Sequence, residues 1–214
     1  VSISGILVIL STAEYYNAIV LPKKDTVGIW VAYLCTCILL FVVGITGISV
    51  FFSEQIAQLF NTPDLANYYW LLPIFILITG GWNILNYWYI RHTRYSSISK
   101  YQLSQSTFSA IAKIGFGHAG ILRGGLIYSI VIAPLLSLII RLITLYRSGI
   151  KNQLLRPSWE HIKAVAKRYK KFPQFSLPRS FVNMVAGQLP VLLLTPLFGA
   201  EYIGWWSMAL LLGF

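Results

Sequence analysis

Long runs of apolar residues alternate with short polar gaps along the chain. A helix that spans a membrane needs about 20 mostly apolar residues, and several runs approach or exceed that length. The runs cover residues 1–12, 27–52, 68–90, 104–122, 124–146, 177–198 and 202–214. The first run resembles the end of a span, and the last resembles the beginning of one. The pattern therefore predicts an all-α fold, a polytopic membrane helix bundle.

Composition and charge placement strengthen this prediction. The chain is 57% hydrophobic and 11% charged, whereas soluble domains average about 25% charged residues. Fifteen of the 17 basic residues lie in or beside alternate gaps, and the intervening gaps hold acidic residues or the single Arg123. Cytoplasmic loops of membrane proteins carry such an excess of Lys and Arg. The net charge of +11 therefore indicates loops near anionic lipid, and we expect no nucleic-acid partner.

The one long gap, residues 147–175, is predicted to be cytoplasmic and to contain an amphipathic helix. Ser158 is a candidate N-cap, with Glu160 in the first turn. One face of this helix would carry Trp159, Ile162, Ala166 and Tyr169, and the other Lys163, Lys167, Lys170 and Lys171. The pattern fits a helix lying on the inner leaflet and equally a solvated linker helix between two bundles.

Polar residues inside the spans recur at helical spacing. The stripes comprise Gln105, Ser109 and Lys113; Thr79, Asn83 and Asn86; Asn183 with Gln188 beside it; and Ser137 with Arg141. Such residues can join helices by hydrogen bonds worth about 0.6 kcal/mol each, or they can line a water-filled cavity. Lys113 favours the cavity, because a Lys at mid-membrane costs about 2.5–3.5 kcal/mol. Its partner is a carboxylate elsewhere in the protein or an anionic substrate, unless the side chain reaches the membrane surface.

Helix-breaking residues are expected to interrupt several spans, as they do in many transporters. These residues are Pro73, Gly80, Gly81, Pro134, Pro190 and Pro196.

No arrangement of residues in the chain predicts catalysis. The sequence has no paired carboxylates at a common site and no Gly-rich phosphate loop. Cys35 and Cys37 form no metal-binding pattern, because no second pair exists. We therefore expect a protein that is not an enzyme and binds neither a cofactor nor a metal. A membrane transferase remains an alternative, and it would require large outer loops.

Several short motifs resemble one family in their order and in their placement against the spans. They are AIVLPK at residues 18–23, NYW at 86–88 followed by Arg91 and Arg94, KRYKKFP at 167–173, SLP at 176–178, QLPVLLL at 188–194 and FGAEYIG at 198–204. Together they resemble the Wzx-like polysaccharide flippases of the multidrug/oligosaccharidyl-lipid/polysaccharide exporter superfamily. The chain departs from the family at Glu14 and Tyr16, where members often carry Arg and Glu.

The resemblance implies a fragment, about half of a full chain. Residues 1–146 would form the first six-helix lobe without its first helix, 147–176 a cytoplasmic linker, and 177–214 the start of a second lobe. The implied activity moves a polyprenyl-pyrophosphate-linked oligosaccharide across the bacterial cytoplasmic (inner) membrane by alternating access. It would serve lipopolysaccharide, O-antigen or exopolysaccharide synthesis in the cell envelope.

On this hypothesis the polar stripes bind the substrate. Lys113 would attract the pyrophosphate or an acidic sugar, and Arg141 would receive the pyrophosphate near the inner face. The residues expected to bind the sugar are Gln105, Ser109, Asn83, Asn86, Asn183 and Gln188. Membrane lipids, a polysaccharide polymerase and other assembly proteins are the further candidate partners. The alternatives are a multidrug antiporter of the same superfamily and a non-transporting scaffold of a polysaccharide assembly complex.

Overall fold

The computed structural model describes residues 2–55, 69–118, 125–147 and 158–198. These residues form helices and no strand, which confirms the predicted all-α class. The α-helices are α1 (Ser2–Thr12), α2 (Asp25–Ser49), α4 (Leu71–Arg91), α5 (Tyr95–His118), α6 (Gly125–Arg147), α7 (Trp159–Arg168) and α8 (Leu177–Phe198). The shorter helical turns are η1 (Tyr15–Val20), η2 (Val50–Phe52) and the π-helical η5 (Phe172–Ser176).

The helices follow the predicted apolar runs closely, except at the start of α5. Helix α8 coincides with the 177–198 run, and α6 differs from the 124–146 run by one residue at each end. Helix α5 begins at Tyr95 rather than near Ser104. The reason is the tight turn after α4, where Thr93 adopts a positive φ of 53° and the next helix starts two residues later. The predicted run at 202–214 lies outside the described residues.

The prediction that helix-breaking residues interrupt the spans is wrong for α4, α6 and α8. Helix α4 continues through Pro73, Gly80 and Gly81, and α6 continues through Pro134. Helix α8 likewise runs through positions 190 and 196. Pro73 lies in the first turn of α4, where its missing N–H has no intrahelical acceptor to lose.

Gly80 marks the closest approach between α4 and its neighbours. A Cβ atom at this position would collide with the Leu39 side chain of α2 and would lie 3.2 Å from Ser11 Oγ of α1. Gly80, Ser11 and Leu39 are all buried. The absence of a side chain at Gly80 therefore lets three helices meet at one point, as small residues do between membrane helices.

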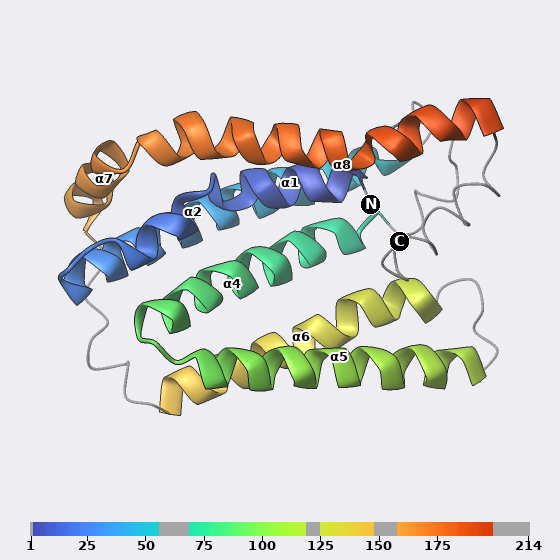
Figure 1. The fold of residues 1–214 in the computed structure, drawn as a ribbon, viewed down its shortest axis with the longest axis horizontal. Helices are drawn as coiled ribbons and strands as arrows, with labels where there is room; N and C mark the ends of the chain where they lie inside the picture. Colours follow the sequence, from blue (N-terminus) through green and yellow to red (C-terminus); the bar gives the residue numbers. More distant parts are fainter. Residues whose placement is uncertain (1, 56–68, 119–124, 148–157, 199–214) are drawn as a thin grey trace.

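The helices form two groups joined by α4. Figure 1 shows the α5–α6 hairpin along one side of α4, while α1, α2 and α8 lie on the other. The larger core lies between α1, η1, α2, α4 and α7, and it includes the fully buried Ile19, Val31, Cys35 and Ile76. A smaller core joins α4 to α6 through Ile78, Leu85 and Leu138. Helix α8 packs on α1, where Met184 Sδ lies 3.1 Å from a Cβ atom built on Gly5.

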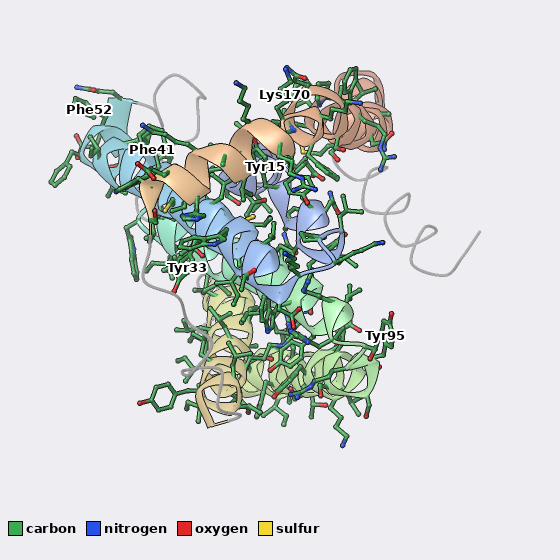
Figure 2. The ribbon with its side chains drawn as sticks, turned by 90° about the vertical axis from the view of Figure 1, so that its left-hand side faces the viewer. Tyr15, Tyr33, Phe41, Phe52, Tyr95 and Lys170 are labelled. Atoms are coloured by element: carbon green, nitrogen blue, oxygen red, sulfur yellow. The ribbon has the colours of Figure 1, made fainter. Side chains whose placement is uncertain are left out.

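Two described helical segments are long and apolar enough to cross a membrane, Asp25–Gln55 and Leu71–Arg91. The outer side of the first segment carries exposed apolar side chains, including Ile45, Ile48 and Phe51. Figure 2 shows Phe41 and Phe52 of the same segment on the outside of the bundle. An apolar outer surface of this kind is typical of contact with lipid or with another helix.

Helix α7 packs onto the end of the bundle where α2 begins (Figure 1). Ile162 and Val165 are buried there, and the His161 ring stacks on Trp30 with centroids 4.9 Å apart. Tyr15 Oη donates a hydrogen bond to the Ala166 carbonyl at 3.2 Å. The predicted amphipathic helix therefore forms, and its apolar face lies against protein.

Two details of α7 differ from the sequence prediction. Trp159 was placed on the same face as Ile162, but it lies at the first residue of the helix and is 69% exposed. Ser158 does occupy the N-cap position, but its side chain makes no capping hydrogen bond. The four predicted lysines, Lys163, Lys167, Lys170 and Lys171, are all exposed.

Arg91 at the end of α4 holds the start of α2. Its guanidinium donates to Asp25 Oδ1 from Nε at 3.0 Å and from Nη2 at 2.9 Å. Nη1 donates to the carbonyl of the fully buried Ile19 at 2.8 Å. Gly28 leaves room for this side chain, since a Cβ atom there would lie 2.9 Å from Arg91 Cζ.

We expect Gly80→Val to lower the free energy of unfolding by about 1–3 kcal/mol, because added bulk forces closely packed helices apart. Gly44→Val is the matched control, since a Cβ atom at Gly44 meets nothing within 4 Å. Denaturant unfolding of the intact protein in detergent measures both. Equal effects at the two positions would show that α4 can move away from α2 without cost.

We expect Arg91→Ala to lower the free energy of unfolding by about 1.5–3 kcal/mol, because it leaves the buried Ile19 carbonyl without its charged donor. Arg94→Ala, an exposed cation three residues further on, should change stability by less than about 0.5 kcal/mol. Thermal unfolding of the two variants in parallel makes the comparison. An Arg91 variant as stable as the Arg94 variant would contradict the assignment.

Candidate functional site

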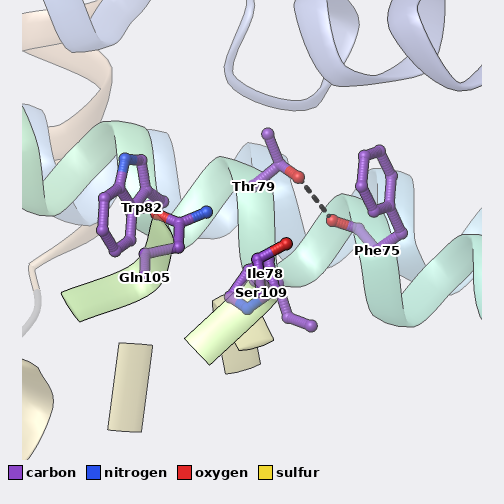
Figure 3. Close-up of a pocket in the computed structure, with 7 residues that line it drawn as sticks. Phe75, Ile78, Thr79, Trp82, Gln105 and Ser109 are labelled. Carbon is purple, nitrogen blue, oxygen red and sulfur yellow. Dashed lines mark hydrogen bonds between the residues drawn. The ribbon is translucent and has the colours of Figure 1, made fainter. Parts of the chain in front are cut away.

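A pocket of about 330 Å³ lies between α4, α5 and α6. Its lining residues are Phe75, Ile78, Thr79, Trp82, Gln105, Ser109 and Pro134. Figure 3 shows these side chains, together with the hydrogen bond from the Thr79 hydroxyl to the Phe75 carbonyl, which is 2.8 Å long. The pocket therefore combines apolar and aromatic walls with a few amide and hydroxyl groups, as small-molecule sites commonly do.

The pocket brings together residues that the sequence analysis assigned to two different stripes. Gln105 and Ser109 are one turn apart on α5, so their side chains share a face. Thr79 belongs to the stripe on α4. Gln105 and Ser109 form no hydrogen bond with another described residue. Their donors and acceptors are consequently available to a ligand.

Arg141 of α6 lies beside this pocket and is fully enclosed, with 0% of its surface exposed. Its Nη1 donates to Asn86 Oδ1 at 2.6 Å. Its Cζ lies 3.8 Å from the ring centroid of Trp82, 4.8 Å from that of Tyr101 and 5.6 Å from that of Tyr89. Two of the predicted site residues, Asn86 and Arg141, are thus paired with each other in this conformation.

The Arg141 guanidinium is only partly satisfied by hydrogen bonds. Its Nε and Nη2 atoms are buried and have no hydrogen-bond partner among the described residues. The faces of aromatic rings carry partial negative charge and attract a guanidinium stacked on them. The rings around Arg141 therefore supply the stabilisation that hydrogen bonds would otherwise provide. Ser137, one turn before Arg141, donates to the Tyr101 carbonyl at 3.4 Å and ties α6 to α5 in the same region.

Lys113 lies one turn beyond Ser109 on α5 and is exposed on the surface of the described bundle. No described residue forms an ion pair or a hydrogen bond with it. The structure therefore places Lys113 next to the polar stripe but outside the residues that line the pocket.

The remaining predicted site residues are not gathered at the pocket. Asn83 is half-buried on α4 and is not among the lining residues. Asn183 is exposed on α8, which Figure 1 shows across α1 and α4 from the α5–α6 hairpin. The Gln188 side chain lies outside the described part of the chain.

Sequence reasoning missed Trp82, the aromatic residue shared by the pocket and by Arg141. A signal was present, because Trp82 lies three residues after Thr79 and four before Asn86 and so shares their face of α4. Within the spans, only polar, charged and helix-breaking residues were taken as candidates, and Trp82 is none of these. Its importance depends on Arg141, which is distant in the sequence.

Glu14 is a second feature whose arrangement the sequence did not reveal. It is 4% exposed, and it has a φ of 61°, a left-handed conformation that is uncommon for residues other than Gly. Tyr16 Oη donates to its Oε1 at 3.1 Å, and Asn17 Nδ2 donates to its Oε2 at 2.6 Å. Burial, and then the nearby Glu14, raises the pKa of Tyr16, which keeps the phenol protonated as a donor. These bonds fix the sharp turn between α1 and η1.

The described residues contain no group of three His, Cys, Asp or Glu side chains that could hold a metal ion. Among the described residues, no charged side chain lines the pocket. The arrangement therefore suits a neutral, polar ligand with an apolar face, bound within an all-helical bundle.

These features define an all-helical protein with a mainly apolar pocket between helices that carries a few polar groups. The chain matches the family described as polysaccharide biosynthesis protein over residues 3–212. It therefore belongs to the polysaccharide biosynthesis protein family, which confirms the family indicated by the sequence motifs and supports a role in polysaccharide biosynthesis. No curated protein and no solved structure matches the chain significantly.

The bond between Asn86 and Arg141 can be tested by a double-mutant cycle with Asn86→Ala and Arg141→Met. We expect a coupling free energy of about 1.5–3 kcal/mol, the range for hydrogen bonds to charged groups. The four unfolding free energies, measured in detergent, define it. The pair Asn83→Ala and Arg141→Met serves as the control and should be additive to about 0.5 kcal/mol. Additivity in the Asn86 cycle would show that the bond contributes nothing to stability.

Proposed function

We propose that the protein is a flippase that moves a polyprenyl-pyrophosphate-linked oligosaccharide across the bacterial cytoplasmic membrane by alternating access. It catalyses no covalent reaction in this proposal. The observation that carries the proposal is the pocket between α4, α5 and α6, whose mainly apolar walls carry the polar groups of Thr79, Gln105 and Ser109, in a chain of the polysaccharide biosynthesis family. A carrier for sugars needs such hydrogen-bonding groups within an otherwise apolar bundle, whereas a purely structural bundle does not.

The apolar outer surface of α2 supports a membrane location for this activity. Phe41, Ile48 and Phe51 are exposed to the outside of the bundle, where water would be an unfavourable environment. The basic residues of α7 lie at one end of the bundle, as expected for the cytoplasmic side. Substrate would then enter from that side and leave from the other.

Lys113 supports an anionic component in the substrate. It extends the Gln105 and Ser109 stripe by one turn and has no ion-pair partner among the described residues. An ammonium group beside a neutral sugar pocket would attract a pyrophosphate attached to that sugar. A polysaccharide polymerase or another assembly protein remains a candidate partner that would receive the product.

A second candidate function is ion-coupled export of small cationic compounds, as in an antiporter. The observation that favours it is Glu14, whose carboxylate is almost fully buried. A carboxylate inside the bundle could attract a cationic compound by its negative charge. Vesicles containing the intact protein distinguish the two functions: a flippase moves a lipid-linked oligosaccharide, and an antiporter exports a cationic dye such as ethidium when a proton gradient is applied.

The flippase proposal predicts that Lys113→Ala lowers the rate of oligosaccharide flipping about tenfold, the loss that follows from about 1.4 kcal/mol of charge attraction. The assay uses reconstituted intact protein and a polyprenyl-pyrophosphate-linked oligosaccharide. Lys100→Ala, an exposed Lys on the same helix, should leave the rate within about twofold.

The two possible failures of this test have different meanings. If the unmodified protein moves no lipid-linked oligosaccharide, the flippase proposal is wrong. If the unmodified protein is active and Lys113→Ala is equally fast, the flippase proposal stands and Lys113 has no part in binding the substrate.

A further inference from the structure

We propose that the pocket between α4, α5 and α6 binds one neutral pyranose ring, with Trp82 as the surface on which the ring stacks. Arg141 acts as a positioning residue that fixes the Trp82 indole and does not itself touch the substrate. This inference rests on the proposed function, because the pyranose would be one unit of the transported oligosaccharide.

The composition of the pocket matches the surface of a sugar ring. A pyranose presents C–H groups on its faces and hydroxyl groups around its edge. The electron-rich face of an aromatic ring favours contact with C–H groups, and Trp82 and Phe75 provide aromatic surface in the pocket. The volume of about 330 Å³ lies at the lower end of the range for small-molecule sites, which suits a single sugar unit.

The polar side chains of the pocket provide complementary hydrogen bonds. Gln105 offers an amide that can donate and accept, and Ser109 offers a hydroxyl that can do either. Thr79 donates its hydroxyl proton to the Phe75 carbonyl, so toward a ligand it can only accept. None of the lining residues in the described part of the chain is charged. A neutral sugar is therefore favoured over an acidic one, whose carboxylate would lose hydration without gaining a cation.

Arg141 is held too firmly to serve as a substrate contact in this conformation. It has no exposed surface, donates to Asn86 at 2.6 Å and lies 3.8 Å from the Trp82 ring centroid. A guanidinium stacked on one face of the indole restricts the rotamers available to Trp82. The same indole lines the pocket, so its orientation toward a ligand is set before the ligand binds, which lowers the cost of binding.

Protection of an introduced cysteine tests the pocket directly. Ser109→Cys is made in the intact protein after removal of the other cysteines, Cys35 and Cys37 included, and its rate of reaction with a water-soluble maleimide is measured in detergent. The probes are free glucose, galactose and N-acetylglucosamine. Mannitol, a polyol without a ring, is the control ligand. Thr107→Cys, an exposed position on α5 that does not line the pocket, is the control site.

We expect at least one of the cyclic sugars to slow labelling of Ser109→Cys, by about threefold at twice its dissociation constant. Mannitol should not slow it, and no probe should slow labelling of Thr107→Cys. Adding Trp82→Leu should abolish the protection, whereas Trp82→Phe, which keeps an aromatic face, should retain part of it.

The positioning role of Arg141 has its own readout. Arg141→Lys keeps the positive charge but loses the planar group that stacks on Trp82. We expect it to raise the dissociation constant of the protecting sugar about two- to fivefold, with mannitol still inactive. A residue that only stabilised the fold would lower the melting temperature and leave the sugar affinity of the folded protein unchanged.

Several outcomes would overturn the inference. They are the absence of protection by every cyclic sugar, equal protection by mannitol, and full protection in the Trp82→Leu variant. If that variant does not fold, the comparison of cyclic sugars with mannitol on an intact Trp82 still decides the matter. If sugars protect Ser109→Cys but the protein moves no lipid-linked oligosaccharide in vesicles, the flippase proposal is wrong and the sugar-binding pocket stands. If the protein moves the oligosaccharide but no sugar protects Ser109→Cys, the flippase proposal stands and the sugar-binding pocket is wrong.

Discussion

The packing of α4, α5 and α6 depends on one buried positive charge, the guanidinium of Arg141, which has no exposed surface. Removing a guanidinium from water costs several kcal/mol unless other groups replace its hydration. The replacement for Arg141 comes from two neighbouring helices: Asn86 and Trp82 belong to α4, and Tyr101 belongs to α5. Because no single helix can provide this environment, α4, α5 and α6 must pack together for the charge to be tolerated.

Helix α4 links this environment to the rest of the molecule. One face packs against α1 and α2, where Gly80 lets the backbones approach closely. Another face carries Trp82 and Asn86 toward Arg141. The end of the helix carries Arg91, which bonds to Asp25 and Ile19. A movement of α4 relative to α2 would therefore also disturb the Arg141 environment, and the pocket beside it would change shape.

Periodicity in the sequence was sufficient to predict the helices but not their contacts. The 177–198 run matched α8 because apolar length alone determines a helix in such a bundle. Gly80 and Pro134 were misjudged as interruptions, since their effect depends on neighbouring helices that the sequence does not place. The face shared by Gln105 and Ser109 could be predicted because both residues lie on one helix. The pairing of Asn86 with Arg141 could not, because it joins two helices.

The site therefore differs from the predicted one in which of its two cations is available to a ligand. Arg141 was expected to meet pyrophosphate, but its hydrogen bond to Asn86 and its three aromatic neighbours leave it no exposed surface. Lys113 is the one cation among the predicted site residues that remains exposed. It follows Ser109 by four residues, a rise of about 6 Å along the helix. A sugar ring in the pocket would thus have its attached phosphate within a short distance of an available ammonium group, so neutral and anionic parts of one substrate could be bound along a single face of α5.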